Sequence, residues 1–240
     1  MEASAALVTG ASRRIGREIA LKLAKDGHNL ALHYNNSLSS AEELRDEISK
    51  MGRKCEIFRA DLNSHSQRSK LIENVFSEFK TLSILVNNAS SFEPCDFLQT
   101  TEKDFDDQFG INFKAPFFLT QSFVKKADSG VIINMLDTRV FRNDTDFFIY
   151  NLSKKSLHQL TKMLARELAP KFRVHGLCLG PILAPSYNGP SEDLATLKRN
   201  TPMEKVGTPS DIARILSLLA HEPLLTGICL PLDGGESLLY

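Results

Sequence analysis

Tyr150 and Lys154 are four residues apart, which is the spacing of two side chains on one face of a helix. An ammonium group beside a phenol lowers the pKa of that phenol because it favours the phenolate form. A tyrosine tuned in this way is suited to general acid catalysis. Asp137, thirteen residues upstream, adds a carboxylate that would affect the phenol if the fold brings the two side chains together. Like charges would then raise one pKa of the Asp137/Tyr150 pair.

A glycine-containing turn follows an apolar run at residues 5–8. Gly10 and Gly16 allow a tight turn and a close approach of the backbone to a ligand. Apolar residues at helical spacing follow, up to Lys25. The free amides and the dipole at the start of that helix suit a pyrophosphate group. The turn therefore predicts a dinucleotide site.

Length and composition permit one large core: the chain has 240 residues, of which 42% are hydrophobic and 24% charged. No linker, repeat or low-complexity tract divides it, so we expect a single domain over residues 1–240. The formal net charge is zero and no basic stripe is present, which argues against nucleic acid as a partner. The first residues lead straight into a predicted strand, and no apolar run approaches the roughly 20 residues that span a bilayer. We therefore expect a cytoplasmic protein with no membrane partner.

Cysteine and histidine positions predict no metal site. The four cysteines lack paired spacing, so we expect small buried core residues instead of a disulfide framework or a zinc site. The six histidines show no ligand spacing either.

Strand and helix patterns alternate along the whole chain. Short runs rich in Val, Ile or Leu predict strands at 5–10, 28–34, 54–60, 82–87, 130–136, 172–178 and 227–232. Helices fill the gaps, with start signals at Ser39, Ser64 and Thr208. This alternation predicts a doubly wound α/β sheet, whose ligands lie beyond the carboxyl ends of the strands. Gly10, Asn87, Asp137 and Gly180 fall at those ends.

Together these residues resemble the short-chain dehydrogenase/reductase family over essentially the whole chain. The resemblance is carried, in order, by Thr9-Gly10 to Gly16, Asp61-Leu62, Asn87-Asn88-Ala89, Asn112, Tyr150 with Lys154, and Leu232-Asp233-Gly234-Gly235. It implies a single Rossmann-type domain with a seven-stranded parallel sheet and helices on both faces. It also implies a nicotinamide cofactor and hydride transfer centred on Tyr150 and Lys154, with Asn112 holding a water that links Lys154 to solvent.

Three departures from the family pattern are similar to its pteridine reductase branch, including the bacterial dihydromonapterin reductases. Arg14 replaces the middle glycine of the turn, Ser90-Ser91-Phe92 follows Asn-Asn-Ala, and Asp137 replaces the catalytic serine. A pterin is a flat polar heterocycle whose edge both donates and accepts hydrogen bonds. Its pocket needs a stacking ring, a cation and groups that donate and accept, and Phe92, Arg14, Ser90 and Asp137 supply this set.

The second predicted strand ends in His33-Tyr34-Asn35-Asn36-Ser37, without the acid that usually holds both ribose hydroxyls of NAD. Arg13 can reach a 2′-phosphate, and His33 and Ser37 can add hydrogen bonds. NADPH is therefore the expected cofactor. The predicted cofactor-binding residues are Gly10, Ser12, Arg13, Arg14, Ile15, Gly16, His33, Tyr34, Asn35, Ser37, Asp61, Leu62, Asn88, Ala89, Ser90, Tyr150, Lys154, Gly180 and Ile182.

The expected reaction delivers hydride to an imine carbon of a pterin, and the adjacent ring nitrogen takes a proton from Tyr150 or through Asp137. The catalytic set is Asp137, Tyr150, Lys154 and Asn112, and the substrate set is Arg14, Ser90, Phe92, Asp137, Tyr150, Pro181 and Leu183. One alternative is a carbonyl reductase of the 3-oxoacyl-thioester type, although Asp137 donates to a carbonyl only when protonated. The other is a non-catalytic regulator that senses NADP(H).

Two larger features complete the expectation. Residues 181–208 are rich in proline and glycine and predict a substrate lid. The family resemblance implies a homotetramer, in which a helix over about 148–170 with Leu152, Leu160, Leu164 and Leu168 and the apolar end Leu238-Leu239-Tyr240 would form the contacts. The alternative is that these leucines face the core of the monomer.

Overall fold

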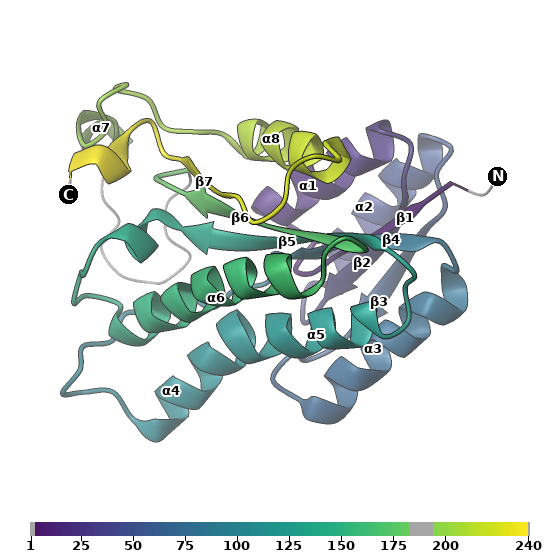
Figure 1. Cartoon of the computed structure of the whole chain (residues 1–240), viewed down its shortest axis with the longest axis horizontal. Coiled ribbons are helices and arrows are strands. Elements are labelled where there is room, and N and C mark those ends of the chain that lie inside the picture. The colour runs from purple at the N-terminus through teal and green to yellow at the C-terminus, as the bar shows by residue number, and fades with distance from the viewer. Residues whose placement is uncertain (1–2, 183–193, 240) are drawn as a thin grey trace.

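Seven strands form one parallel sheet in the order β3-β2-β1-β4-β5-β6-β7 (Figure 1). The computed structural model describes residues 3–182 and 194–239. All seven predicted strands are present, and every strand end lies within two residues of its prediction. The strands are β1 Ala5–Val8, β2 Asn29–Tyr34, β3 Cys55–Arg59, β4 Leu82–Asn87, β5 Gly130–Asp137, β6 Phe172–Leu179 and β7 Cys229–Leu232.

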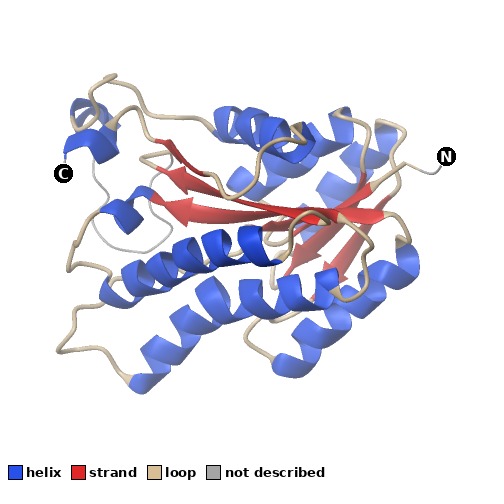
Figure 2. Ribbon diagram, viewed as in Figure 1, coloured by secondary structure: helices blue, strands red, loops and turns tan. Residues whose placement is uncertain are grey.

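Helices cover both faces of the sheet, as Figure 2 shows. One face carries α1 (Arg14–Lys25), α2 (Leu38–Lys50) and α8 (Pro209–His221). The other carries α3 (His65–Glu78), α5 (Ala115–Val124) and α6 (Phe148–Glu167). The remaining helical segments are α4 Glu102–Phe109, the π-helical turn η1 Gly110–Lys114, the 3-10 helix η2 Thr138–Phe141, α7 Leu194–Arg199 and the 3-10 helix η3 Glu236–Leu239. The predicted Rossmann-type doubly wound domain is confirmed.

Alternation along the strands divides the core between the two faces. Successive strand residues point to opposite faces of a sheet. Val8 therefore packs in a cluster with Ile19 and Leu216, whereas Leu7 packs in a second cluster with Leu119 and Phe123. All ten side chains of β1 and β2 are buried, which explains why β1 is entirely apolar and why β2 carries three apolar residues, Leu30, Ala31 and Leu32, at its centre.

Helix starts agree with the sequence at two of three predicted caps. Thr208 and Asp211 form a capping box, followed by a proline in the first turn of α8. The hydroxyl of Ser64 accepts the Gln67 amide at the start of α3. The predicted box at Ser39 is wrong because α2 already begins at Leu38, and the Ser39 hydroxyl donates to Glu43 instead.

The leucine stripe on α6 mainly serves the core of its own subunit. Leu160 is buried, and Leu164 and Leu168 pack against core clusters of this chain. Only Leu152 of the four is exposed, with 40% of its surface accessible. Three of the four leucines therefore contribute to the core of their own chain, and the predicted subunit contact through this stripe remains a prediction.

The strand order has a switch point between β1 and β4: β2 and β3 follow on one side of this point, and β5, β6 and β7 follow on the other. In open α/β sheets ligands bind at the carboxyl ends of the strands beside such a point. Among the described helices, none is long and apolar enough to cross a membrane.

Candidate active site

A cleft of about 740 Å³ lies at the carboxyl ends of the strands. Most of the predicted cofactor and substrate residues line it. Asp61 and Asn112 are described but do not line it, and Leu183 lies outside the described residues. The cleft is also lined by residues that the sequence analysis does not select, notably Thr138, Arg139, Arg142, Asp146, Phe147 and Glu236.

Close packing of the first turn requires glycine at two positions. Gly10 has a φ of +62°, in the left-handed region that favours glycine. A Cβ at Gly16 would lie 2.2 Å from the Gly10 carbonyl oxygen and 2.7 Å from the Asn88 side-chain nitrogen. The start of α1 can therefore approach the turn closely only without a side chain at Gly16. This leaves backbone amides at the helix start available to an anion.

Arg14 occupies a backbone position that glycine would adopt more easily, with a φ of +52°. A non-glycine residue in this region costs about 1–2 kcal/mol. Its side chain nevertheless lines the cleft. The strain is therefore consistent with a functional role for the guanidinium group.

The turn is fastened to β4 by Thr9 and Asn88. The Asn88 side chain donates to the carbonyl oxygens of Thr9 (2.8 Å) and Gly10 (3.1 Å). In return, the Thr9 hydroxyl accepts the amides of Asn88 and Ala89 at 2.8 and 3.0 Å. The predicted cofactor residues Asn88 and Ala89 thus also hold the turn in place.

His33 differs from its predicted role. Its Nδ1 accepts the Gly10 amide at 3.1 Å, so Nε2 carries the proton and donates to the Ala60 carbonyl at 2.9 Å. Burial lowers the pKa of His33 to about 4, which keeps the ring neutral. Because both ring nitrogens are engaged, the prediction that this imidazole binds a 2′-phosphate is wrong; His33 supports the turn from below.

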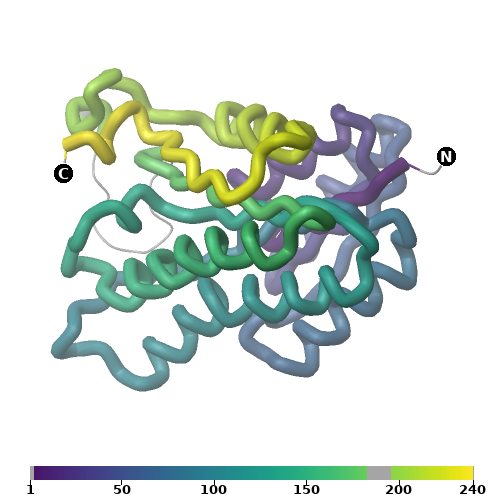
Figure 3. Tube along the Cα trace, in the orientation of Figure 1, coloured from purple at the N-terminus to yellow at the C-terminus, as the bar shows by residue number. Residues whose placement is uncertain are grey.

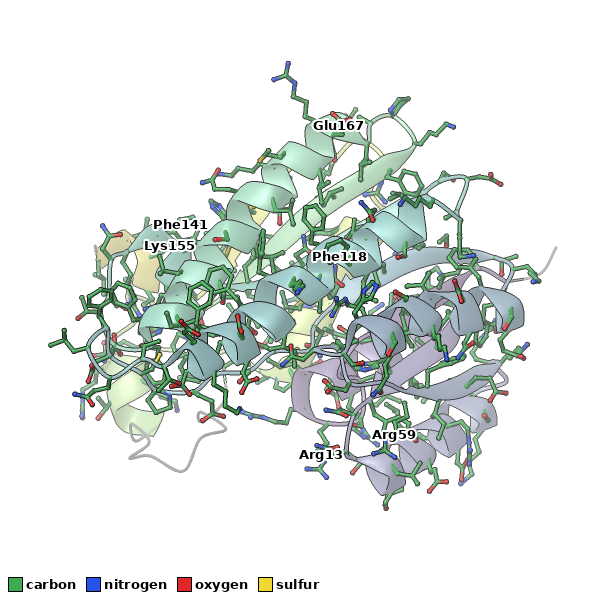
Figure 4. All side chains as sticks on the ribbon, turned by 90° about the horizontal axis from the view of Figure 1, so that it is seen from below. Arg13, Arg59, Phe118, Phe141, Lys155 and Glu167 are labelled. Atoms are coloured by element: carbon green, nitrogen blue, oxygen red, sulfur yellow. The ribbon has the colours of Figure 1, made fainter. Side chains whose placement is uncertain are left out.

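Two guanidinium groups lie near the predicted 2′-phosphate region. Arg13 precedes α1, and its Nε donates to the Ser40 hydroxyl at 3.4 Å. Arg59, at the end of β3, donates to the Asn35 carbonyl at 3.2 Å. Figure 4 shows Arg13 and Arg59 on one side of the molecule, well apart from Phe141 of η2. No local sequence signal marks Arg59, because only the pairing of β2 with β3 brings it to Asn35.

Tyr150 and Asp137 meet as predicted, but with a different electrostatic result. The Tyr150 hydroxyl donates to Asp137 Oδ2 at 2.9 Å, and Asp137 Oδ1 accepts the Arg139 amide at 2.8 Å. Burial, then the charge of Asp137 and its hydrogen bond, raises the pKa of Tyr150 well above its usual 10. The predicted raising of one pKa of the pair is confirmed. The prediction that Lys154 lowers the phenol's pKa is wrong in this arrangement.

Lys154 lies on the same face of α6 as Tyr150 and is also buried. Its Nζ is 5.6 Å from the centre of the Tyr150 ring and donates to the Met135 carbonyl at 2.9 Å. Burial lowers the pKa of Lys154 to about 8, and Asp137 acts against this shift. At neutral pH the site therefore holds a protonated phenol and a largely charged ammonium.

Asn112 is fully buried in the π-helical turn between α4 and α5. Its side-chain oxygen accepts the Ser90 hydroxyl (2.7 Å) and the Ser91 amide (3.0 Å), and its nitrogen donates to the Ser91 carbonyl (2.9 Å). Asn112 therefore fixes the loop that leads to Phe92. Its predicted link to Lys154 through a water remains a prediction.

Three aromatic rings that line the cleft, those of Phe92, Phe147 and Tyr150, pack against one another. Phe92 stacks on Phe147 with ring centres 4.1 Å apart and an angle of 8°, and meets Tyr150 edge-on at 4.6 Å. The Arg139 guanidinium lies 5.1 Å from the centre of Phe147. Phe147 has a φ of +55°, which is unusual for a phenylalanine. Its position directly before α6 is the only feature of the sequence that could have selected it.

Ion pairs tie the residues after Asp137 together. Arg139 pairs with Asp144 and Asp146 at 3.2 Å. Arg142 pairs with Asp144 at 2.6 Å and with Glu236 at 3.2 Å. In the described part of the chain, no group of three or more potential metal ligands is present.

Comparison with known proteins agrees with this geometry. The family model for short chain dehydrogenases matches residues 4–194. A 3-oxoacyl-[acyl-carrier-protein] reductase FabG from Staphylococcus epidermidis is 32% identical over 237 residues, covering 96% of this chain and 97% of its own. The short-chain dehydrogenase/reductase FrzI from a Cladobotryum species is 31% identical, with coverage of 96% and 95%.

Among solved structures, FolM Alternative dihydrofolate reductase 1 from Brucella suis, in complex with NADP, superimposes with a TM-score of 0.93. The two are 30% identical, and the match covers 99% of this chain and 96% of that one. A short chain dehydrogenase from Burkholderia cenocepacia, also in complex with NADP, has a TM-score of 0.91 at 27% identity and covers 97% of each chain.

Proposed function

The chain belongs to the short-chain dehydrogenase family, and we propose that it is an NADPH-dependent reductase of pterins that acts on a ring C=N bond. The observation that carries the proposal is the hydrogen bond between Tyr150 and Asp137 beside the Phe92 ring. This arrangement offers a flat heterocycle a stacking surface, a proton donor and a carboxylate in one place. The likeness to FolM Alternative dihydrofolate reductase 1 supports it.

NADPH is the cofactor, since the chain is an NADP-dependent oxidoreductase of this family and its relatives of known structure bind NADP. The residues present fit it. A Cβ at Gly16 would fill the space beside the turn, and no acid stands at the end of β2. Arg13 would hold the 2′-phosphate, and Arg59 adds positive charge beside Asn35. When bound, NADPH supplies the hydride.

Proton delivery falls to Tyr150. Its phenol keeps its proton at neutral pH because burial and Asp137 raise its pKa. That proton goes to the ring nitrogen next to the carbon that receives hydride, so the C=N bond becomes CH–NH. General acid help of this kind contributes about 10²–10⁴-fold. Asp137 orients the phenol before transfer and presents an acceptor to a donor on the pterin edge.

Other side chains bind and orient the reactants. Lys154 lines the cleft, and its ammonium group donates to the Met135 carbonyl. With the cofactor bound, this group would donate to the hydroxyls of the nicotinamide ribose instead. Phe92 supplies the stacking face, and Ser90 and Arg14 line the cleft beside it. Stacking fixes both reactants in one orientation, which lowers the entropic barrier.

A second candidate function follows from the FabG relatives, which are named for reduction of a 3-oxoacyl thioester. Tyr150 could donate to the substrate carbonyl in that reaction, but a carboxylate at position 137 adds an acceptor where the family's serine supplies a second donor. The test is NADPH oxidation with dihydromonapterin, dihydrobiopterin and dihydrofolate against an acetoacetyl thioester. Turnover of a dihydropterin supports the proposal, turnover of the thioester alone overturns it, and NADPH binding without any turnover indicates a regulator.

We also propose a homotetramer, which two exposed apolar surfaces support. An aromatic face runs along α4, η1 and α5, and its members are Phe105, Phe109, Phe113, Phe117 and Phe118. Phe105 and Phe118 remain 42% and 37% exposed. Leu238 and Leu239 at the C-terminal end are 83% and 56% exposed, which supplies a second apolar surface.

A further inference from the structure

We propose that Glu236 is a positioning residue that fixes the end of β5, and with it Asp137, from the C-terminal turn. Glu236 lines the same cleft as Tyr150 although it is near the end of the chain. The inference rests on the proposed function for its kinetic test, but its structural basis is independent of the substrate. It concerns the side chains that hold Asp137 in place.

Glu236 binds two residues of the turn that follows Asp137. Its Oε2 accepts the Thr138 hydroxyl at 2.9 Å, and its Oε1 lies 3.2 Å from Arg142 NH1. The Arg142 and Glu236 side chains are only 13% and 14% exposed, and Thr138 is buried. A pair so shielded from water is screened far less than a surface pair. It therefore holds η2 against η3 more firmly than an exposed contact would.

The turn that carries Glu236 is itself fixed. The Asp233 carboxylate accepts the amides of Gly235 and Ser237 at 2.9 and 2.8 Å. A Cβ at Gly180 would lie 2.5 Å from Asp233 Cβ, so β6 can approach this turn only through glycine. Figure 3 shows the C-terminal segment returning beside the part of the chain near residue 200. There the Met203 amide donates to the Gly234 carbonyl at 3.0 Å.

These contacts converge on Asp137. Asp137 directly precedes Thr138, and its carboxylate receives both the Arg139 amide and the Tyr150 hydroxyl. If Glu236 releases Thr138 and Arg142, the turn that orients this carboxylate loses two of its contacts and keeps the weaker bond of Thr138 to the Leu179 carbonyl (3.3 Å) and the pair of Arg142 with Asp144. The Asp137–Tyr150 geometry then loosens, while the glycine turn at Gly10 stays as it is. Catalysis should fall without loss of cofactor affinity.

The main variant is Glu236→Gln, which keeps the shape and an acceptor for Thr138 but removes the charge that pairs with Arg142. Arg142 retains Asp144 as a partner, so the fold should survive. We expect kcat for a dihydropterin to fall about 10- to 100-fold, the scale of a small misplacement of reacting groups. The Kd for NADPH should change by no more than about twofold, because Glu236 is not expected to contact the cofactor. Glu236→Gln combined with Arg142→Gln should be no worse than the poorer single variant, because both remove one interaction.

A second readout needs no substrate. Tyrosine labelled with ¹³C at Cζ gives one signal for each of the four tyrosines, and Tyr150→Phe identifies the signal of Tyr150. Glu236→Gln should move this signal because the hydrogen bond to Asp137 changes. The control is Glu78→Gln. Glu78 is the last residue of α3 and does not line the cleft, and this substitution removes its ion pair with Lys54.

The two readouts separate the possible outcomes. If the wild type reduces no dihydropterin, the proposed function fails, but a shifted Tyr150 signal in Glu236→Gln still supports the positioning role. Wild-type kcat together with an unmoved Tyr150 signal overturns it. A loss confined to NADPH affinity also overturns it, because Glu236 would then serve the cofactor and not Asp137.

Discussion

The Tyr150 hydroxyl donates its hydrogen bond to Asp137 Oδ2 at 2.9 Å, so the proton of the proposed general acid points at a carboxylate. A serine in place of Asp137 would neither repel a phenolate nor accept so strong a bond. Burial, together with the charge and the hydrogen bond of the carboxylate, raises the pKa of Tyr150 and keeps the phenol protonated over the physiological range. Tyr150 then releases its proton only to a substrate that binds both the phenol and the Asp137 carboxylate. The edge of a pterin ring, which has a hydrogen-bond donor beside an acceptor, is suited to this.

Asp137→Ser tests this relationship. Dihydropterin reduction should fall at least ~10²-fold, the lower range for lost proton-transfer help, while NADPH still binds. The substitution removes the charge that raises the pKa of Tyr150, so that pKa should fall. The alkaline limb of the rate profile, where the acid loses its proton, should therefore move to lower pH. The measurements are steady-state rates against pH and NADPH binding by fluorescence.

Tyr150→Phe is the matched control, because it keeps the ring against Phe92 and removes only the hydroxyl. It should bind NADPH and lose turnover. Wild-type rates in Asp137→Ser with an unchanged pH profile would show that Asp137 is only a cap for η2, and the pterin proposal would lose its main support.

Arg13→Ala tests the cofactor preference. The affinity for NADPH should fall by about 1.5–3 kcal/mol, the usual contribution of a hydrogen bond to a charged group, while the affinity for NADH stays nearly constant. Calorimetric titration with both cofactors measures the difference. Lys25→Ala, at the other end of α1, is a control that should change neither. Equal losses for both cofactors would remove Arg13 from the 2′-phosphate site.

Arg14→Gly should separate stability from substrate binding. Glycine adopts a φ of +52° without strain, so the melting temperature should rise, by an amount corresponding to about 1 kcal/mol. Loss of the guanidinium should at the same time raise KM for the dihydropterin more than the Kd for NADPH. Thermal unfolding and steady-state kinetics on the same preparation test both effects. A lower melting temperature would mean that the side chain stabilises the turn by more than its backbone costs.

The strands and the proximity of Tyr150 to Lys154 could be predicted because their causes are local. Short runs rich in apolar residues identify buried parallel strands such as β1, and the proximity of Tyr150 and Lys154 follows from a single helix. The pairing of Arg142 with Glu236, 94 residues apart, has no local cause, because only the return of the C-terminal turn to η2 creates it. Long-range partners of this kind need the fold before they can be assigned.

His33 shows a different limit. Its position after a strand fits a phosphate ligand as well as it fits a support for the turn, since an imidazole can do either. The choice depends on the Gly10 amide and the Ala60 carbonyl, which the sequence does not place within reach. For Tyr150 the sequence suggests that Asp137 raises the pKa of the phenol, but it does not show the burial that is the larger cause.

The aromatic face of α4 and α5 predicts a subunit contact. Phe118→Glu should place a charge there and shift the assembly toward smaller species in equilibrium sedimentation at micromolar concentration. Leu38→Glu on α2, also at an exposed apolar residue, is the control and should leave the mass unchanged. A monomeric wild type would overturn the tetramer proposal outright.

The last prediction concerns acid stability, which His33 and His175 should control. Burial lowers the pKa of both to about 4 from the ordinary 6.5, so the unfolded chain binds protons that the folded chain does not. Their contribution is complete above pH 6.5 and is lost as the pH falls toward 4, amounting to about 3 kcal/mol for each at most. The free energy of unfolding in urea should therefore drop steeply over this interval. His33→Gln should flatten that slope, whereas His65→Gln on the exposed start of α3 should keep it. If His33→Gln retains the wild-type slope, His33 is protonated in the folded protein and cannot accept the Gly10 amide.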